Sequence, residues 1–141
     1  MSVTLRAATR ADVEAVLHLW AEDAAEATHT DNAHCLERLL SRDPEALIVA
    51  EDPDDNRDRL VGTVVAAWDG WRGSVYRLVV ARTHRRMGLG GALVAAAELR
   101  LAQAGAERLQ AIVVATGPGA VRFWTATGWE RQSERLRFVR G

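Results

Sequence analysis

The stretch RTHRRMGLGGALV, residues 82–94, places three arginines and a histidine ahead of a glycine-rich turn and then continues as an apolar helical pattern. It follows the apolar run SVYRLVVA, residues 74–81, so the chain passes from a strand through this turn into a helix. A helix start exposes unpaired backbone N–H groups at the positive end of the helix dipole. The stretch therefore predicts an α/β protein with an anion site, most simply for phosphate, at the turn.

The two most familiar phosphate motifs do not fit this turn. A Walker loop needs Gly-Lys-Ser/Thr, and all 18 basic residues of this chain are arginine. A dinucleotide fingerprint needs Gly-x-Gly-x-x-Gly, whereas the glycines here are Gly88, Gly90 and Gly91. Another class of phosphate-binding protein is needed to explain the turn.

Hydrophobic periodicity and capping signals predict the remaining elements. A helix after Thr9 and Asp12, which form a capping box, has an apolar face of Val13, Val16, Leu17 and Trp20. Strands are expected at 3–8, 46–51, 59–68, 74–81 and 108–115, the last one buried, with a final strand or hairpin in 129–140; further helices are expected near 31–41, at 89–104 and at 118–127. The order is β-α-α-β-β-β-α-β-α-β, and the three successive strands form an antiparallel meander.

Length and composition favour one globular domain over residues 1–141, with 48% hydrophobic and 26% charged residues. No run approaches the roughly 18 apolar residues that a membrane-spanning helix needs, so no membrane partner is expected. Cys35 is the only cysteine and forms no internal disulfide, which fits a cytoplasmic protein.

Charge is divided between the two halves of the chain. Residues 1–70 carry 15 acidic and 6 basic side chains, a net charge of −9, and residues 71–141 carry 4 and 12, a net charge of +8. The five tryptophans lie on different predicted elements and form no stacking platform, so no nucleic-acid partner is expected. The basic half instead suits an anionic ligand at the turn.

The acidic loop DPDDNRD spaces four oxygen-bearing side chains as a calcium loop does, at Asp52, Asp54, Asn56 and Asp58. Position six is Arg57 instead of glycine, and position twelve is Thr63 instead of glutamate. The loop is therefore expected to join two strands of a hairpin, and no metal site is predicted.

Two motifs resemble the GNAT superfamily of N-acetyltransferases. Residues 85–90, RRMGLG, match the family motif Arg/Gln-x-x-Gly-x-Gly/Ala at every specified position. Downstream, GAVRFWTATGWE is similar to the motif Ala-x-x-Phe-Tyr-x-x-x-Gly-Phe, with Ala120, Phe123, Trp124, Gly128 and Trp129 in register. The predicted element order is also that of the family. The resemblance implies a GNAT fold with a mixed central sheet of about six to seven strands and helices on both faces.

The resemblance also implies acetyl-coenzyme A as co-substrate. Its pyrophosphate would lie on backbone N–H groups from Arg86 to Ala92, and its pantetheine arm between the strands ending near Ala81 and Ala115. The cofactor-binding residues implied are Leu78, Val80, Arg85, Arg86, Met87, Gly88, Leu89, Gly90, Gly91, Ala92 and Phe123. Alternatively, the glycines only permit a tight turn and the arginines are solvated; Arg82 and His84, outside the motif, are expected at the surface.

Direct attack by an amine on the thioester needs an oxyanion donor, for which the main-chain N–H of Val80 is a candidate. The family's usual acid, a tyrosine, is replaced here by Trp124, and Gly117 stands where asparagine is common. An indole donates a hydrogen bond but gives up no proton near neutral pH. Tyr76 can replace the acid or line the acceptor pocket if no bulge turns it from the face of Leu78 and Val80; otherwise it is a core or rim aromatic.

Candidates for the general base are Glu22 and Glu26, one turn apart near the end of the first helix, where the family builds its acceptor pocket. His29 and His34 have suitable ordinary pKa values, and for all four a solvated surface is the alternative. The acceptor implied is a small-molecule or peptide amine, and a homodimer is possible. The rival functions are a non-catalytic acyl-coenzyme A-binding module and a basic adaptor without cofactor.

Overall fold

The computed structural model describes residues 2–55, 60–114 and 119–141. The chain divides into two compact units, Met1–Ala111 and Ile112–Gly141. The elements are β1 (Thr4–Ala7), the 3-10 turn η1 (Arg10–Asp12), α1 (Val13–Asp23), α2 (Ala33–Arg42), β2 (Leu47–Glu51), β3 (Leu60–Trp68), β4 (Gly73–Val80), the 3-10 turn η2 (Arg82–His84), α3 (Leu89–Ala104), β5 (Leu109–Ala111) and α4 (Ala120–Ala126).

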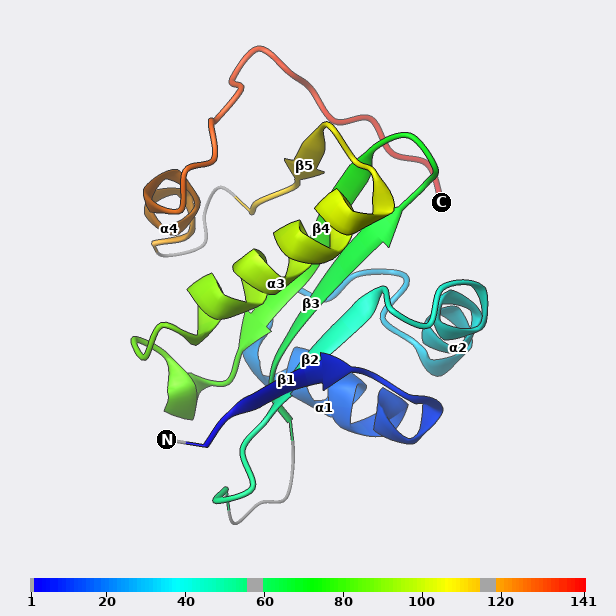
Figure 1. The fold of residues 1–141 in the computed structure, drawn as a ribbon, viewed down its shortest axis with the longest axis vertical. Coiled ribbons are helices and arrows are strands. Elements are labelled where there is room, and N and C mark those ends of the chain that lie inside the picture. The colour runs from blue at the N-terminus through cyan, green and yellow to red at the C-terminus, as the bar shows by residue number, and fades with distance from the viewer. Residues whose placement is uncertain (1, 56–59, 115–118) are drawn as a thin grey trace. The chain divides into compact units, whose positions relative to one another are not determined.

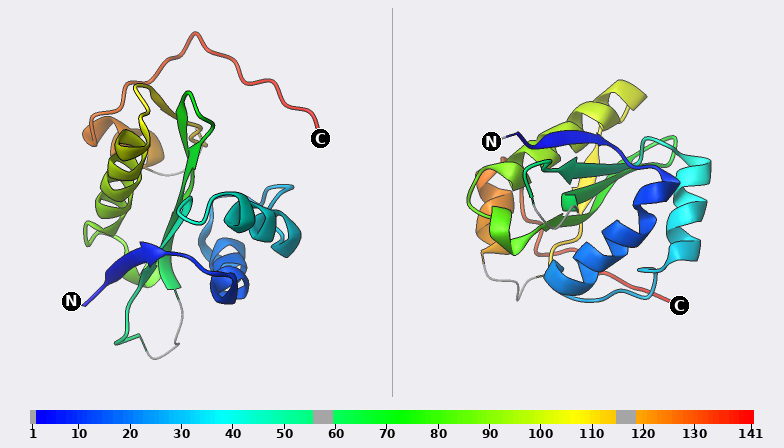
Figure 2. Two further views of the ribbon diagram at one scale, coloured as in Figure 1. Left: turned by 45° about the vertical axis from the view of Figure 1, so that its right-hand side comes forward. Right: turned by 90° about the horizontal axis from the view of Figure 1, so that it is seen from below.

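The first unit is built on a five-stranded sheet in the order β1-β2-β3-β4-β5. Neighbouring strands are antiparallel except β4 and β5, which are parallel. Helix α3 covers one face of the sheet, and α1 and α2 lie on the other (Figures 1 and 2). The predicted meander of β2, β3 and β4 and the mixed sheet are confirmed, whereas the sheet of the described residues has five strands and not the six to seven expected.

The core lies between the sheet and its helices, where the predicted helix faces are largely buried. On α3, Leu93, Ala97 and Leu101 are fully buried. Gly73 lets the start of β4 pack closely against its neighbours. A Cβ at this position would come 2.9 Å from Leu101 of α3 and 2.6 Å from Leu109 of β5. On α1 the prediction was wrong at one position: Leu19 is buried and Leu17 is only half-buried. On α2, Leu36 and Leu40 are buried, whereas Cys35 and Leu39 are half-buried.

Between α1 and the sheet, three polar groups form a chain of hydrogen bonds. The indole Nε1 of Trp20 donates to Thr63 Oγ1 at 2.8 Å, and this hydroxyl donates to the carbonyl oxygen of Arg77 at 3.0 Å. Trp20 and Thr63 are buried. Thr63 thus joins α1 to the backbone of β4 within the core.

Of the two strands predicted near the C-terminus, the first is present but shorter than expected, and the second is absent. The strand expected over 108–115 is the three-residue β5, half-buried at best, and Ile112 is 52% exposed. Residues 129–141 contain no strand, and Leu136, Phe138 and Val139 are exposed. Alternating apolar residues alone do not make a strand, because the backbone also needs a partner to satisfy its hydrogen bonds.

Replacing Thr63 by valine keeps the shape of the side chain and removes both hydrogen bonds. We expect Thr63→Val to lower the free energy of unfolding by about 2–4 kcal/mol, because two buried polar groups each lose a partner. Urea denaturation measures this. Adding Trp20→Phe provides the control: Thr63→Val should cost less in that background, and an equal cost in both would contradict the role of the indole bond.

Candidate functional site

The turn at which the sequence predicts an anion site lies between β4 and α3. Gly88, the residue before α3, has φ +78° and no side chain that could cap the helix. The first hydrogen bond of the helix runs from the Ala92 N–H to the Gly88 carbonyl at 3.1 Å, so the preceding N–H groups, of Leu89, Gly90 and Gly91, have no intrahelical partner. These three amides lie at the positive end of a 16-residue helix. The arrangement can hold a phosphate or diphosphate.

The turn carries exposed cations and an unusual backbone conformation. The side chains of Arg82, Arg85 and Arg86 are exposed. Arg86 has φ +63°, a left-handed conformation that is uncommon for a residue with a side chain. Positive charge and free backbone donors therefore occupy the same few residues, as an anion site needs.

His84 is buried, so its expected place at the surface was wrong. Its ring Nε2 lies 2.8 Å from Asp52 Oδ2 and its Nδ1 lies 2.8 Å from the Thr83 hydroxyl. The hydrogen bond from His84, helped by the Asp54 N–H, lowers the pKa of the Asp52 carboxyl below its usual value. Asp52 belongs to the acidic loop that was predicted to join two strands without a metal site, and it bonds the turn through His84. Asn56 and Asp58 of this loop lie outside the described residues. Sequence reasoning missed this pair because 32 residues separate its members.

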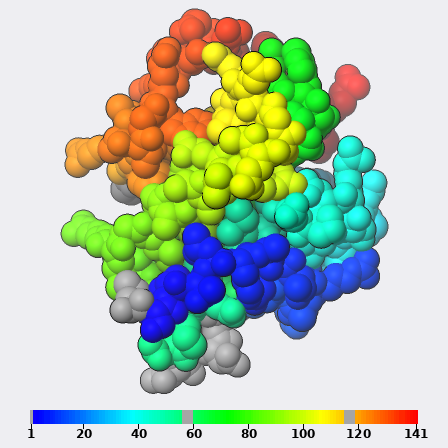
Figure 3. Space-filling model, in the orientation of Figure 1, coloured from blue at the N-terminus to red at the C-terminus, as the bar shows by residue number. Residues whose placement is uncertain are grey.

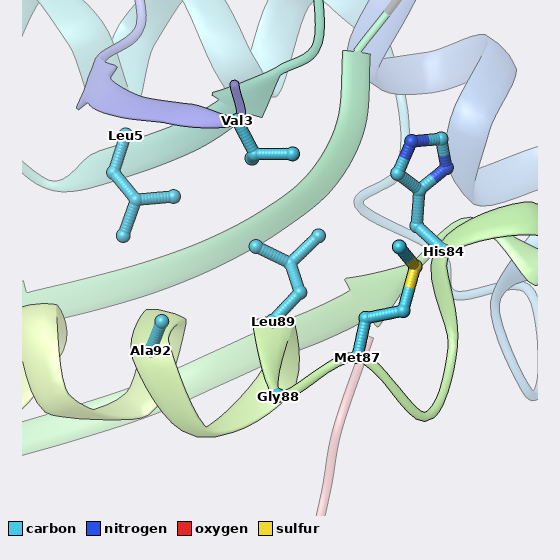
Figure 4. Close-up of a pocket in the computed structure, with 7 residues that line it drawn as sticks. All are labelled: Val3, Leu5, His84, Met87, Gly88, Leu89 and Ala92. Atoms are coloured by element: carbon cyan, nitrogen blue, oxygen red, sulfur yellow. The ribbon is translucent and has the colours of Figure 1, made fainter. Parts of the chain in front are cut away.

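His84 also lines a cavity of about 180 Å³ beside the turn. Val3 and Leu5 face Leu89 across it, and Met87 lies next to the His84 ring (Figure 4). In the space-filling view the β1 region (blue) borders the start of α3 (light green) at this place (Figure 3). The lining of this cavity is therefore mostly apolar.

A bulge in β4 decides where Tyr76 points. Thr63 pairs with Val79 and Val65 with Tyr76, so Arg77 and Leu78 together oppose Val64. Arg77 has φ +50°, as expected for an inserted residue in a bulge. Tyr76 consequently shares the face of Thr63, toward α1. Val80 pairs with Gly62, and a Cβ added at Gly62 would meet Leu93 of α3, so Val80 is on the α3 face. Tyr76, 43% exposed, thus lies on the opposite face from Val80.

Beyond Val75, β4 has no paired strand on its β5 side within the described residues. The parallel register with β5 ends at Val75 and Ala111, five residues before β4 itself ends at Val80. The Ala81 N–H donates to the Val61 carbonyl at 2.8 Å, and neighbouring residues of an antiparallel strand point their N–H groups in opposite directions. The Val80 N–H therefore points away from β3, where it can meet a ligand.

The other predicted side chains lie between the last turn of α1 and the start of α2. Glu22 Oε1 lies 3.0 Å from His18 Nε2 on the same helix. Glu26 and His29 are exposed between α1 and α2, and His34 is exposed on α2. Among the described residues, His, Cys, Asp and Glu side chains nowhere gather in a group that could hold a metal ion.

Phe123 and Trp124 belong to α4 in the second unit. The Trp124 ring packs edge-to-face against Trp129, with centroids 4.9 Å apart, and against Phe123 at 5.7 Å. The three aromatic residues of this motif thus form one cluster. Ala115 and Gly117, the other positions named for this part of the site, lie outside the described residues.

Comparison with known proteins identifies relatives of this chain. The model of the acetyltransferase (GNAT) family matches residues 13–129. A curated acetyltransferase of Yersinia enterocolitica is 30% identical over 128 residues, covering 91% of this chain and 88% of the relative. No helix in the described ranges is long and apolar enough to cross a membrane.

Solved structures share the fold at low identity. The NatC complex bound to Gag peptide and CoA matches with a TM-score of 0.79 at 18% identity, covering 94% of this chain and 87% of that one. An aminoglycoside N-acetyltransferase in complex with CoA matches with a TM-score of 0.73 at 17% identity, covering 99% and 95%. At these identities the likeness concerns the fold.

The contact between Asp52 and His84 makes stability depend on pH in a defined direction. Because the pKa of Asp52 is lowered in the folded state, its contribution is present above the ordinary carboxyl pKa of about 4 and is lost as the pH falls through the folded value. We expect Asp52→Asn to lower the free energy of unfolding more at about pH 6.5 than near pH 3. Urea denaturation at both pH values measures this; an equal loss at both would show that the charge of Asp52 does not matter.

Proposed function

Because the chain belongs to the GNAT acetyltransferase family, we propose that it transfers the acetyl group of acetyl-coenzyme A to a primary amine by direct attack. The single observation that carries this proposal is the turn between β4 and α3, where unpaired amides, exposed arginines and a free strand edge meet. The unpaired amides and the arginines fit the anionic phosphates of coenzyme A, and the strand edge fits its amide-bearing pantetheine arm.

The turn supplies the binding energy in this proposal. The N–H groups of Leu89, Gly90 and Gly91 hold the pyrophosphate, and the exposed guanidinium of Arg86 adds charge-assisted hydrogen bonds. The edge of β4 that extends beyond its pairing with β5 offers backbone partners to the pantetheine amides. Within the described residues, the N–H groups of Leu89, Gly90 and Gly91 make no hydrogen bond that the pyrophosphate would have to replace.

The chemistry asks little of side chains. The amine attacks the thioester carbonyl as a free base, a C–N bond forms, the C–S bond breaks, and the proton lost by nitrogen ends on the thiol or in solvent. The Val80 N–H is the candidate donor to the oxygen that gains charge, because it points away from β3. A thiolate leaves readily, since the pKa of its thiol is about 8.5.

Glu22 and Tyr76 remain candidates for moving that proton. Glu22 is paired with His18, so the two can act together as a base at the end of α1. Tyr76 faces α1 and not the side of Val80, so it serves this proposal better as a lining residue of the acceptor pocket than as an acid for the thiolate. We propose a small-molecule or peptide amine as acceptor.

A second candidate function is a non-catalytic acyl-coenzyme A-binding module. The observation that favours it is Trp124, which packs into an aromatic cluster at the position where the family has its tyrosine acid. Acetyl-coenzyme A with a panel of amines, followed by thiol release, separates the two functions. Thiol release with any amine supports the transferase; binding without release supports the module.

The first test of the coenzyme A site is Gly90→Val. A branched side chain at this position in the first turn of α3 obstructs the approach of a phosphate to the helix amides, so coenzyme A should bind more than about tenfold more weakly. Isothermal titration calorimetry measures the affinity. Ala95→Val, exposed on the same helix, is the matched control and should bind normally. Unchanged affinity in folded Gly90→Val would remove the assignment.

The second test concerns the missing acid. If turnover proceeds without a phenol, Trp124→Phe should change kcat by less than about tenfold, because general acid help is worth roughly 10² to 10⁴ and none is lost. Trp124→Tyr restores a donor of pKa about 10 and should raise turnover, with a falling limb near that pH. If neither the unmodified protein nor Trp124→Tyr releases thiol while both bind acetyl-coenzyme A, the module is the function.

A further inference from the structure

The side chain of Arg85 connects the glycine turn to the end of α1. Its Nε donates to the Val80 carbonyl at 3.2 Å and its Nη2 donates to the Asp23 carbonyl at 3.1 Å. Asp23 is the last residue of α1, and its carbonyl is one of those that a helix leaves unpaired at its C-terminus. A cation is favourable there because it also meets the negative end of the helix dipole. Arg85 therefore caps α1 from within the turn.

Arg77, in the bulge of β4, holds the next part of the same segment. Its Nη2 donates to the Glu26 carbonyl at 3.2 Å and forms an ion pair with Asp31. Its guanidinium lies over the Trp20 ring, 4.9 Å from the centroid, and its side chain is only 17% exposed. The segment 23–31, which joins α1 to α2, is thus attached to β4 and to the turn by two arginines.

The two attachments differ in exposure. Arg77 is enclosed by Trp20 and Asp31, whereas the Arg85 side chain is 49% exposed and lies in the anion-binding turn. A guanidinium has five N–H donors, and within the described part of the chain Arg85 uses only its Nε and Nη2 groups. Arg85 has donors left for an anion while it keeps its bonds to Val80 and Asp23.

We propose that Arg85 is a positioning residue that transmits occupancy of the glycine turn to the segment 23–31. The proposal rests on the proposed function, since the anion is the diphosphate of coenzyme A. Once an anion accepts a hydrogen bond from Arg85, the conformational entropy of this side chain is already reduced. The hydrogen bond from Arg85 to the Asp23 carbonyl then costs less entropy and is more stable. Binding at the turn then orders the segment.

The coupling is reciprocal. A ligand that orders the segment 23–31 must raise the affinity of the turn for coenzyme A by the same factor, about fivefold or more for a typical coupling. Arg77 does not contribute to this effect, because its attachment to Glu26 and Asp31 involves no residue of the turn. The segment therefore has one fixed anchor and one anchor that responds to the cofactor.

Hydrogen exchange of the amides in 24–31, followed by mass spectrometry with and without saturating coenzyme A, tests this coupling. In the unmodified protein, coenzyme A should slow exchange of these amides by about fivefold or more. Arg85→Gln keeps one donor group but cannot bridge the Val80 and Asp23 carbonyls. In this variant, saturating coenzyme A should no longer slow exchange of these amides. Arg108→Gln, which removes the same charge at an exposed arginine outside the turn, is the matched control and should keep the slowing.

The outcomes distinguish the inference from the proposed function. If calorimetry detects no coenzyme A binding to the unmodified protein, the proposed function fails and the inference fails with it. If coenzyme A binds but exchange in 24–31 is unchanged, only the inference is overturned. It is also overturned if Arg85→Gln speeds exchange equally with and without coenzyme A, because Arg85 would then only cap α1. Slowing that is lost in Arg85→Gln and kept in Arg108→Gln supports it.

Discussion

The hydrogen bond from the Thr63 hydroxyl to the Arg77 carbonyl secures the bulge of β4, and the geometry of the site depends on that bulge. The inserted residue turns Tyr76 toward α1 and Val80 toward α3, and it lets the Arg77 side chain reach the segment after α1. Because Thr63 also accepts the indole bond of Trp20, the bulge is tied to the packing of α1. Backbone strain at Arg77 is thus balanced by core contacts.

The turn after β4 is attached on both sides of the sheet by consecutive residues. His84 reaches Asp52 next to the apolar cavity beside β1, and Arg85 reaches the end of α1. The backbone between these anchors and α3 is held in place, and within the described residues the first three amides of α3 have no hydrogen-bond partner. A preorganised donor set of this kind binds an anion without first reorganising, which is the property that a phosphate site requires.

Much of the site follows from local sequence. The spacing of glycines and arginines at 85–90 indicates an anion-binding helix start, and the structure has Gly88 in the left-handed conformation that such a turn needs. The helix faces and the meander follow from periodicity in the same way. Partners that are distant in sequence were not predictable: no local pattern pairs His84 with Asp52 or Arg85 with Asp23. The bulge at Arg77 was equally hidden, since a bulge is defined by the partner strand.

By itself, the sequence determined the family, the order of most elements and the residues of the turn, because these depend on spacing along the chain and on capping chemistry. Tertiary structure alone decided that His84 is buried, that Tyr76 and Val80 point to opposite faces, and that the apolar residues near Phe138 form no strand. Those outcomes depend on which backbone groups find partners across the sheet. That pairing is a property of the whole fold, which neighbouring residues do not encode.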